Sequence, residues 1–302
     1  MSNAVRAMSL SPSIGRWSVV MALLATTPGL WADASRPELV SQEQIQKWIK
    51  QLGAEHYAQR EKARDQLQQV GVAAFEALHA AQYDADVEIR KQAEYLLRAI
   101  RISWTQEDDP DVVRQLLRRY QQDDYEKRTD HLAALGRIED GHALSALCRI
   151  ARFETSEILS KRAALEVMQY RLDEQDVDVT ELAKNIAQLM GNSRRPAADW
   201  LRLFAEYVLD PEPTLDRWGA LATAEVEAFD QRPTKVQLEV VKDLLRWRIE
   251  TLQQHGRDRD MLVVLRQFVP LQGKSRDELL RTVNWLLDRQ AWPLVEELIA
   301  SF

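Results

Sequence analysis

Apolar residues recur three and four positions apart along the chain from Ser41 onward. This spacing places them on one face of a helix, so the pattern predicts a series of amphipathic α-helices. Short polar or Gly/Pro segments interrupt it about every 12 to 20 residues, and we expect the helices to end there. These breaks are Gly53, Gly71, Tyr83–Asp86, Glu107–Pro110, Gln121–Asp124, Asp140–Gly141, Asp173–Asp178, Gly191–Pro196, Pro211–Pro213, Gln231–Pro233, His255–Arg257 and Gln272–Ser275.

The composition agrees with helices throughout. The chain has 302 residues, of which 45% are hydrophobic, so it can bury a substantial core. Ten Gly and ten Pro are too few for the many tight turns of an all-β fold. Short connections between helices favour antiparallel neighbours. We therefore predict an all-α fold, a right-handed superhelix (α-solenoid) of antiparallel helical hairpins.

A short phrase recurs four times in the first half of the chain. It consists of a cation, a small residue three positions later and then a leucine-like pair. The copies are spaced 30, 38 and 33 residues apart, within the range of two-helix repeats. The small residue lets paired helices approach closely, and His131 departs from this rule in the third copy. The copies are Arg60-x-x-Ala63, Arg90-x-x-Ala93, Arg128-x-x-His131 and Lys161-x-x-Ala164.

The second copy lies within the phrase Asp86-Val-Glu-Ile-Arg-Lys-Gln-Ala93. This phrase resembles the second helix of a HEAT repeat, and residues 41–172 resemble HEAT repeats. The resemblance is closest between Ile45 and Ile100, a stretch that is similar to the short HEAT domain of large exported bacterial proteins. The resemblance implies an Asp and Arg ladder between successive repeat units. In this sequence the ladder positions would be Asp86, Arg60, Arg90, Arg128 and Lys161.

The phrase disappears beyond residue 172, although the helical pattern continues. Trp200-x-x-Leu203-x-x-x-Tyr207 resembles the opening of a tetratricopeptide repeat, but Asp216 and Ala220 depart from the rest of that motif. We interpret residues 173–302 as irregular helical hairpins with possible tetratricopeptide character.

The N-terminus has the pattern of an export signal. Arg6 and Arg16 precede an uncharged run from Trp17 to Ala32, and Ala32-Asp33-Ala34 offers an A-x-A cleavage pattern. We predict a signal peptide at 1–34 and a protein that is periplasmic or secreted. An uncleaved signal sequence acting as a membrane anchor is the alternative.

The sequence offers few groups for catalysis or ligation. Cys148 is the single cysteine, and the five histidines are dispersed without metal-ligand spacing. The motifs GxSxG, GxxxxGK[ST] and GxGxxG are absent. A net charge of −7 disfavours binding to a phosphate backbone. We therefore expect no catalytic residue, cofactor, metal or nucleic-acid partner.

Tryptophans supply the candidate partner-binding residues. Trp48, Trp200, Trp247 and Trp285 are flanked by apolar residues at helical spacing, which favours core packing. Trp104 and Trp218 lie beside predicted helix breaks, so we expect partly exposed rings there that could anchor a peptide.

Three functional hypotheses follow. The first is a non-enzymatic protein–protein interaction scaffold of the cell envelope or the secreted space, with an unidentified protein partner. The second is an α-helical enzyme or accessory domain acting on envelope polysaccharide, in which His56, Tyr57 or Tyr207 transfers a proton. The third is a regulatory repeat domain of a longer chain, suggested by the apolar helix that ends at Phe302.

Overall fold

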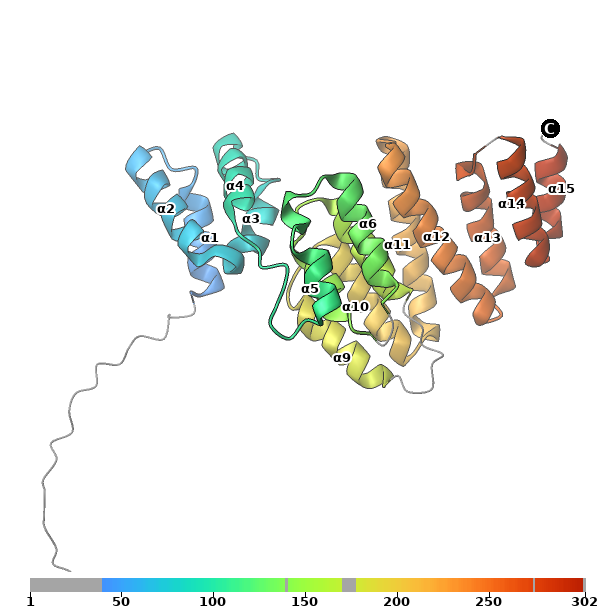
Figure 1. Cartoon of the computed structure of the whole chain (residues 1–302). Helices are drawn as coiled ribbons and strands as arrows, with labels where there is room; N and C mark the ends of the chain where they lie inside the picture. The colour runs from blue at the N-terminus through green and yellow to red at the C-terminus, as the bar shows by residue number, and fades with distance from the viewer. Residues whose placement is uncertain (1–39, 139–140, 170–177, 274, 301–302) are drawn as a thin grey trace, which may run out of the picture. The chain divides into compact units, whose positions relative to one another are not determined.

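The described part of the chain is helical in the computed structural model (Figure 1), which describes residues 40–138, 141–169, 178–273 and 275–300. No strand occurs within these ranges, so the all-α prediction is confirmed for them. The expected signal peptide at 1–34 lies outside the described residues. Residues Ser41–Phe302 belong to one compact unit.

Several helices begin at a residue whose side chain caps the helix. The carboxylate of Asp86 accepts hydrogen bonds from the backbone N–H groups of Glu88 and Ile89, and Ser41 caps the first helix in the same way. Such caps satisfy N–H groups that have no partner inside the helix. Ser275 and Glu278 form a reciprocal capping box.

The first region of the fold contains four helices that pack as two pairs. Helix α1 contacts α2, α3 contacts α4, and the alternate helices α1 and α3, and α2 and α4, also contact each other. Ala63 and Ala93, the small residues of the repeated phrase, are completely buried, as the close approach of paired helices requires. The bounds are α1 Gln42–Gln51, α2 Tyr57–Val70, the 3-10 turn η1 Gly71–Ala74, α3 Phe75–Ala81 and α4 Val87–Ala99.

The second region is built on one continuous hydrophobic cluster that extends from Trp104 to Val295. The cluster continues across residue 173, where the repeated phrase stops. Its first elements are α5 Asp111–Leu117, η2 Tyr120–Gln122, α6 Tyr125–Gly136, α7 Leu144–Phe153, α8 Glu157–Met168, α9 Val179–Met190 and α10 Pro196–Leu209. They are followed by α11 Glu212–Gln231, α12 Lys235–Gln254, α13 Asp258–Phe268, η3 Val269–Leu271, α14 Arg276–Asp288 and α15 Trp292–Ala300.

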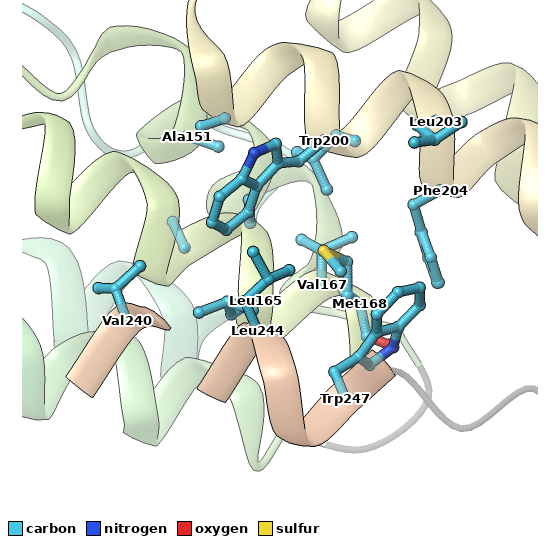
Figure 2. Close-up of a cluster of buried hydrophobic side chains, with 14 of the residues drawn as sticks. Ala151, Leu165, Val167, Met168, Trp200, Leu203, Phe204, Val240, Leu244 and Trp247 are labelled. Atoms are coloured by element: carbon cyan, nitrogen blue, oxygen red, sulfur yellow. The ribbon is translucent and has the colours of Figure 1, made fainter. Parts of the chain in front are cut away.

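Helix α8 lies at the centre of this second region. It contacts α6, α7, α10 and α12, and eight of its residues are buried, including the polar Ser160 and Lys161. Figure 2 shows Leu165 and Val167 of α8 among side chains of α10 and α12, with the rings of Trp200 and Trp247 close by. A helix in a simple stack of hairpins leaves one long side uncovered, and α8 departs from that arrangement.

A small joint connects the two regions. The ring of Phe75 in α3 packs edge-on against Phe153 of α7, with centroids 5.4 Å apart. The carboxylate of Glu76 accepts hydrogen bonds from Ser193 Oγ at 3.0 Å and from Arg152 Nε at 3.4 Å. The guanidinium of Arg195 lies over the Phe75 ring. These contacts fix α3 against the ends of α7 and α9.

Candidate binding groove between α10 and α12

A groove of about 840 Å³ opens between the C-terminal half of α10 and one face of α12, with the end of α8 at its side. Helix α12 contributes residues spaced three and four apart over about four turns, so all of them lie on one face. The lining residues are Met168, Gln169, Phe204, Tyr207, Val208, Pro211, Asp243, Arg246, Trp247, Glu250, Thr251, Gln254 and His255.

Aromatic rings form the floor of the groove. The Trp247 ring lies 5.6 Å from the Tyr207 centroid and 6.3 Å from the Phe204 centroid, in both cases close to perpendicular. The indole Nε1 of Trp247 donates a hydrogen bond to the Met168 carbonyl oxygen at 3.1 Å, and Figure 2 shows these two residues side by side. The ring of Trp218 packs against that of Trp247, with centroids 4.6 Å apart. The floor is therefore held rigidly by neighbouring rings and one hydrogen bond.

Tyr207 and His255 place two polar groups at one end of the groove. Their Oη and Nε2 atoms are 3.2 Å apart, within hydrogen-bond distance, and the rings are perpendicular. Burial raises the pKa of the Tyr207 phenol, so this group stays neutral at physiological pH. It can donate or accept a hydrogen bond there.

Charged side chains of α12 line the rim. Arg246 donates a hydrogen bond to Asp243 at 2.8 Å, and its guanidinium also lies over the Phe268 ring. Glu250 is half-exposed, and its ion-pair partner Arg289 is 3.9 Å away. The Arg289 guanidinium stacks on the Trp285 ring at 3.9 Å from the centroid. Glu250 is consequently the carboxylate of the rim that is least engaged by cations.

The structure corrects the expectation that Trp104 and Trp218 are partly exposed. Trp104 is 8% exposed and Trp218 is 1% exposed. The segment after α4 folds over α7, where the Trp104 carbonyl accepts a hydrogen bond from Arg149 and its ring contacts Tyr120 at 5.1 Å. Trp218 lies inside α11 because Pro211 and Pro213 begin that helix. Proline at a helix start is compatible with the helix that follows, so the predicted break lies before Trp218 and does not expose it.

Two arginines of the expected ladder, Arg60 and Arg90, form hydrogen bonds within their own hairpins. Arg60 and Arg90 are each the fourth residue of their helix. Arg60 Nη1 donates to the Ala54 and Glu55 carbonyls at 2.9 and 3.0 Å. Arg90 Nη1 donates to the Asp84 and Ala85 carbonyls at 2.6 and 3.0 Å. Each arginine thus holds the loop that precedes its helix, while Asp86 caps α4.

The other two cations reach across helices. Arg128, the fourth residue of α6, donates to the Asp123 carbonyl and also pairs with Glu154 at 3.2 Å. Lys161 is the fifth residue of α8, one place later than the arginines. It forms a buried ion pair with Glu225 at 2.8 Å and a second ion pair, at 2.6 Å, with the exposed Glu157. The shift by one position turns it toward α11 instead of its own loop.

The remaining candidates for chemistry lie away from the groove. His56 and Tyr57 are exposed at the start of α2 and are not among the groove residues, so the structure does not bring them together with Tyr207. Cys148 is fully buried, and burial raises the pKa of its thiol to about 12. A thiol with this pKa is protonated at neutral pH and therefore unreactive.

Sequence reasoning missed His255, Glu250 and the role of Trp247 in the groove. The available signal was the mixture of aromatic, acidic and polar residues on one face of α12, since a helix face directed only into a core is apolar. In the part of the chain that the structure describes, no cluster of His, Cys, Asp and Glu side chains could hold a metal ion. No helix in those ranges is both long and apolar enough to cross a bilayer. Comparison with protein-family models, with curated proteins and with solved structures gives no significant match.

Proposed function

We propose that the protein is a non-enzymatic scaffold that holds a segment of a partner protein in the groove between α10 and α12. The observation that carries this proposal is the groove itself, about 840 Å³ with an aromatic floor and a polar rim. Concave sites of this size, in which polar groups orient a ligand over an apolar surface, are typical binding sites. Residues 243 to 255, which belong to α12 and its C-cap, span roughly 18 Å at 1.5 Å per residue. This length matches about five residues of an extended segment.

The packing of alternate helices supports a repeat architecture for this scaffold. The contacts of α1 with α3, of α2 with α4, and of α7 with α9 are those of successive hairpins stacked in two layers. We place a HEAT-like superhelix in the first region only, because α8 is enclosed by its neighbours. The pattern of residues 17 to 32 supports a site of action in the periplasm or outside the cell. N-terminal sequencing of the protein recovered from that compartment tests this, and a start near Ser35 is expected.

Photo-crosslinking in living cells tests the binding function directly. A photoreactive amino acid at Gln254, which lines the groove, should form adducts with a protein, whereas the same group at Gln253 provides the matched control. Gln253 is the preceding residue on α12 and lines a different, smaller hollow of about 310 Å³. Both positions are exposed. Equal adduct patterns at both positions, or none at Gln254, would contradict the proposal.

The Tyr207 and His255 pair favours a second candidate, an α-helical enzyme acting on polysaccharide. A phenol and an imidazole at 3.2 Å in an open groove, with Arg246 on the same wall, could move a proton of a bound sugar. Incubation with envelope polysaccharides and analysis of chain length tests this candidate. Tyr207→Phe should abolish any cleavage, and unchanged chain length with the wild-type protein would exclude it for the polymers used.

A further inference from the structure

The groove combines an apolar floor with an excess of negative charge on its wall. Asp243 and Glu250 are the acidic lining residues, and Arg246 is the one permanent cation among the described lining residues. Arg246 is committed to Asp243 at 2.8 Å and to the Phe268 ring. Among the lining residues this leaves the carboxylate of Glu250, whose cation partner Arg289 lies 3.9 Å away outside the lining, to face a ligand.

The neighbourhood of Glu250 leaves room for a stronger cation partner. The Glu250 side chain is 49% exposed, whereas that of Arg289 is 14% exposed and their closest atoms are 3.9 Å apart. Because Arg289 is stacked on the Trp285 ring, it cannot approach Glu250 without losing that contact. A cation supplied by a ligand would meet a carboxylate that is only weakly neutralised.

The spacing along α12 fixes how the apolar and charged parts of a ligand are separated. Glu250 follows Trp247 by three residues, which is roughly 4.5 Å along the helix axis. In an extended segment, side chains two residues apart lie on one face and are separated by roughly 6.6 Å. A lysine or arginine two positions after an apolar residue would reach Glu250 while the apolar side chain covers the aromatic floor.

We propose that the groove recognises an extended protein segment in which an apolar residue on the ring floor is followed two positions later by lysine or arginine paired with Glu250. This inference rests on the proposed scaffold function and names the chemistry of the partner. The polar groups at the end of the groove, Gln254 and His255, then bond the backbone of the segment.

Selection of random linear dodecapeptides displayed on phage against the immobilised full chain tests the inference. We expect enrichment of apolar-x-Lys/Arg sequences. A fluorescein-labelled consensus peptide is then titrated in anisotropy measurements against the wild-type protein and its variants. Glu250→Arg should weaken binding about fivefold, because it replaces a half-exposed attraction with a repulsion, and a new selection on this variant should favour Asp or Glu at the same place.

Two further variants keep the readout unambiguous. Glu250→Gln removes the charge without adding a repelling cation and should weaken binding by a smaller factor. Glu227→Arg is the matched control, because Glu227 is exposed on α11 and lies outside the groove, and it should leave binding unchanged. Circular dichroism of each variant shows whether the helices are retained.

The possible outcomes separate this inference from the function on which it rests. In the variant Gln254→Trp, the indole ring should fill the groove. A peptide that binds the wild-type protein but not this variant is therefore bound in the groove. Displaced peptides without a basic residue, or with equal affinity for Glu250→Arg, would overturn the inference and leave the scaffold function standing. Peptides unaffected by Gln254→Trp, or no enrichment at all, would overturn both.

Discussion

The first four helices and the region around α8 show two ways of building a core from similar hairpins. In the first region, α1 to α4 contact each other in pairs and in alternation, and none of their polar or charged side chains is buried. In the second region, α8 is enclosed by four helices, and the polar Ser160, Lys161 and Arg149 lie inside. Enclosure forces polar groups to find partners within the protein, because water cannot reach them.

The two regions also differ in how far their ion pairs are buried. Arg149 and Asp109 form a bidentate pair with two bonds of 2.9 Å, and their side chains are 6% and 3% exposed. In the first region, Arg64 pairs with Glu61 on the exposed side of α2, where both side chains are about one-third exposed. The comparison predicts that removing one partner of an ion pair lowers the free energy of unfolding strongly near α7 and α8 and weakly in α1 to α4.

The largest expected effect is that of Asp109→Ala. It leaves the buried Arg149 guanidinium without its carboxylate, which costs about 3–5 kcal/mol of unfolding free energy. Glu61→Ala, the matched change in the first region, should cost less than about 1 kcal/mol. Urea unfolding followed by tryptophan fluorescence measures both. Equal costs would remove the proposed contrast between the regions.

Lys161→Met should destabilise the protein by about 3 kcal/mol, since Glu225 loses its cation while its side chain is 12% exposed. Arg90→Met in the first region removes two bonds to an accessible loop and should cost about 1 kcal/mol. Thermal unfolding by calorimetry gives the two values. A smaller loss for Lys161→Met than for Arg90→Met would show that enclosure of α8 does not govern stability.

Glu76→Ala should loosen the joint between the regions at a cost of about 1–2 kcal/mol, because it removes the bonds to Ser193 and Arg152. Hydrogen exchange followed by mass spectrometry provides the measurement. Exchange should accelerate in α1 to α4 and stay unchanged in α8. Acceleration in both regions to the same extent would mean that they open as a single unit.

The last expected effect depends on pH and concerns the acid stability of the first region. Burial, together with the charge of Arg195, lowers the pKa of His79 from 6.5 to about 4. Between these values the unfolded state binds a proton that the folded state does not, so stability falls as the pH drops from 6.5 to 4. His79→Gln should make this decline shallower, by less than the limit of about 1.4 kcal/mol per pH unit for one proton. An unchanged slope would contradict the role of His79.

The sequence pattern predicted the helices well and their three-dimensional neighbours poorly. Gly71 and Gly191, both with positive φ, end helices where expected. The break at Glu154–Ser156 was missed because it contains neither Gly nor Pro. Its signal was Ser156, which caps α8 through a hydrogen bond from the Leu159 N–H group.

The groove could not be derived from local periodicity. Tyr207 was recognised as a candidate, but its partner His255 lies 48 residues later and meets it only when α10 and α12 flank α11. The prediction that Trp218 is partly exposed was wrong because Pro211 and Pro213 begin a helix that contains Trp218, and do not mark a break beside it. Side-chain direction on packed helices depends on tertiary neighbours, and a single sequence does not specify these.

Arg60 and Arg90 fasten turns that belong to the same hairpin as the arginine itself. A hairpin whose own arginine donates to the carbonyl oxygens of its loop does not depend on the next hairpin for those hydrogen bonds. Whole units of this kind can be duplicated or deleted without leaving an untied loop in the neighbour. The first region is therefore the part of the chain in which length can change most readily by engineering, one hairpin at a time.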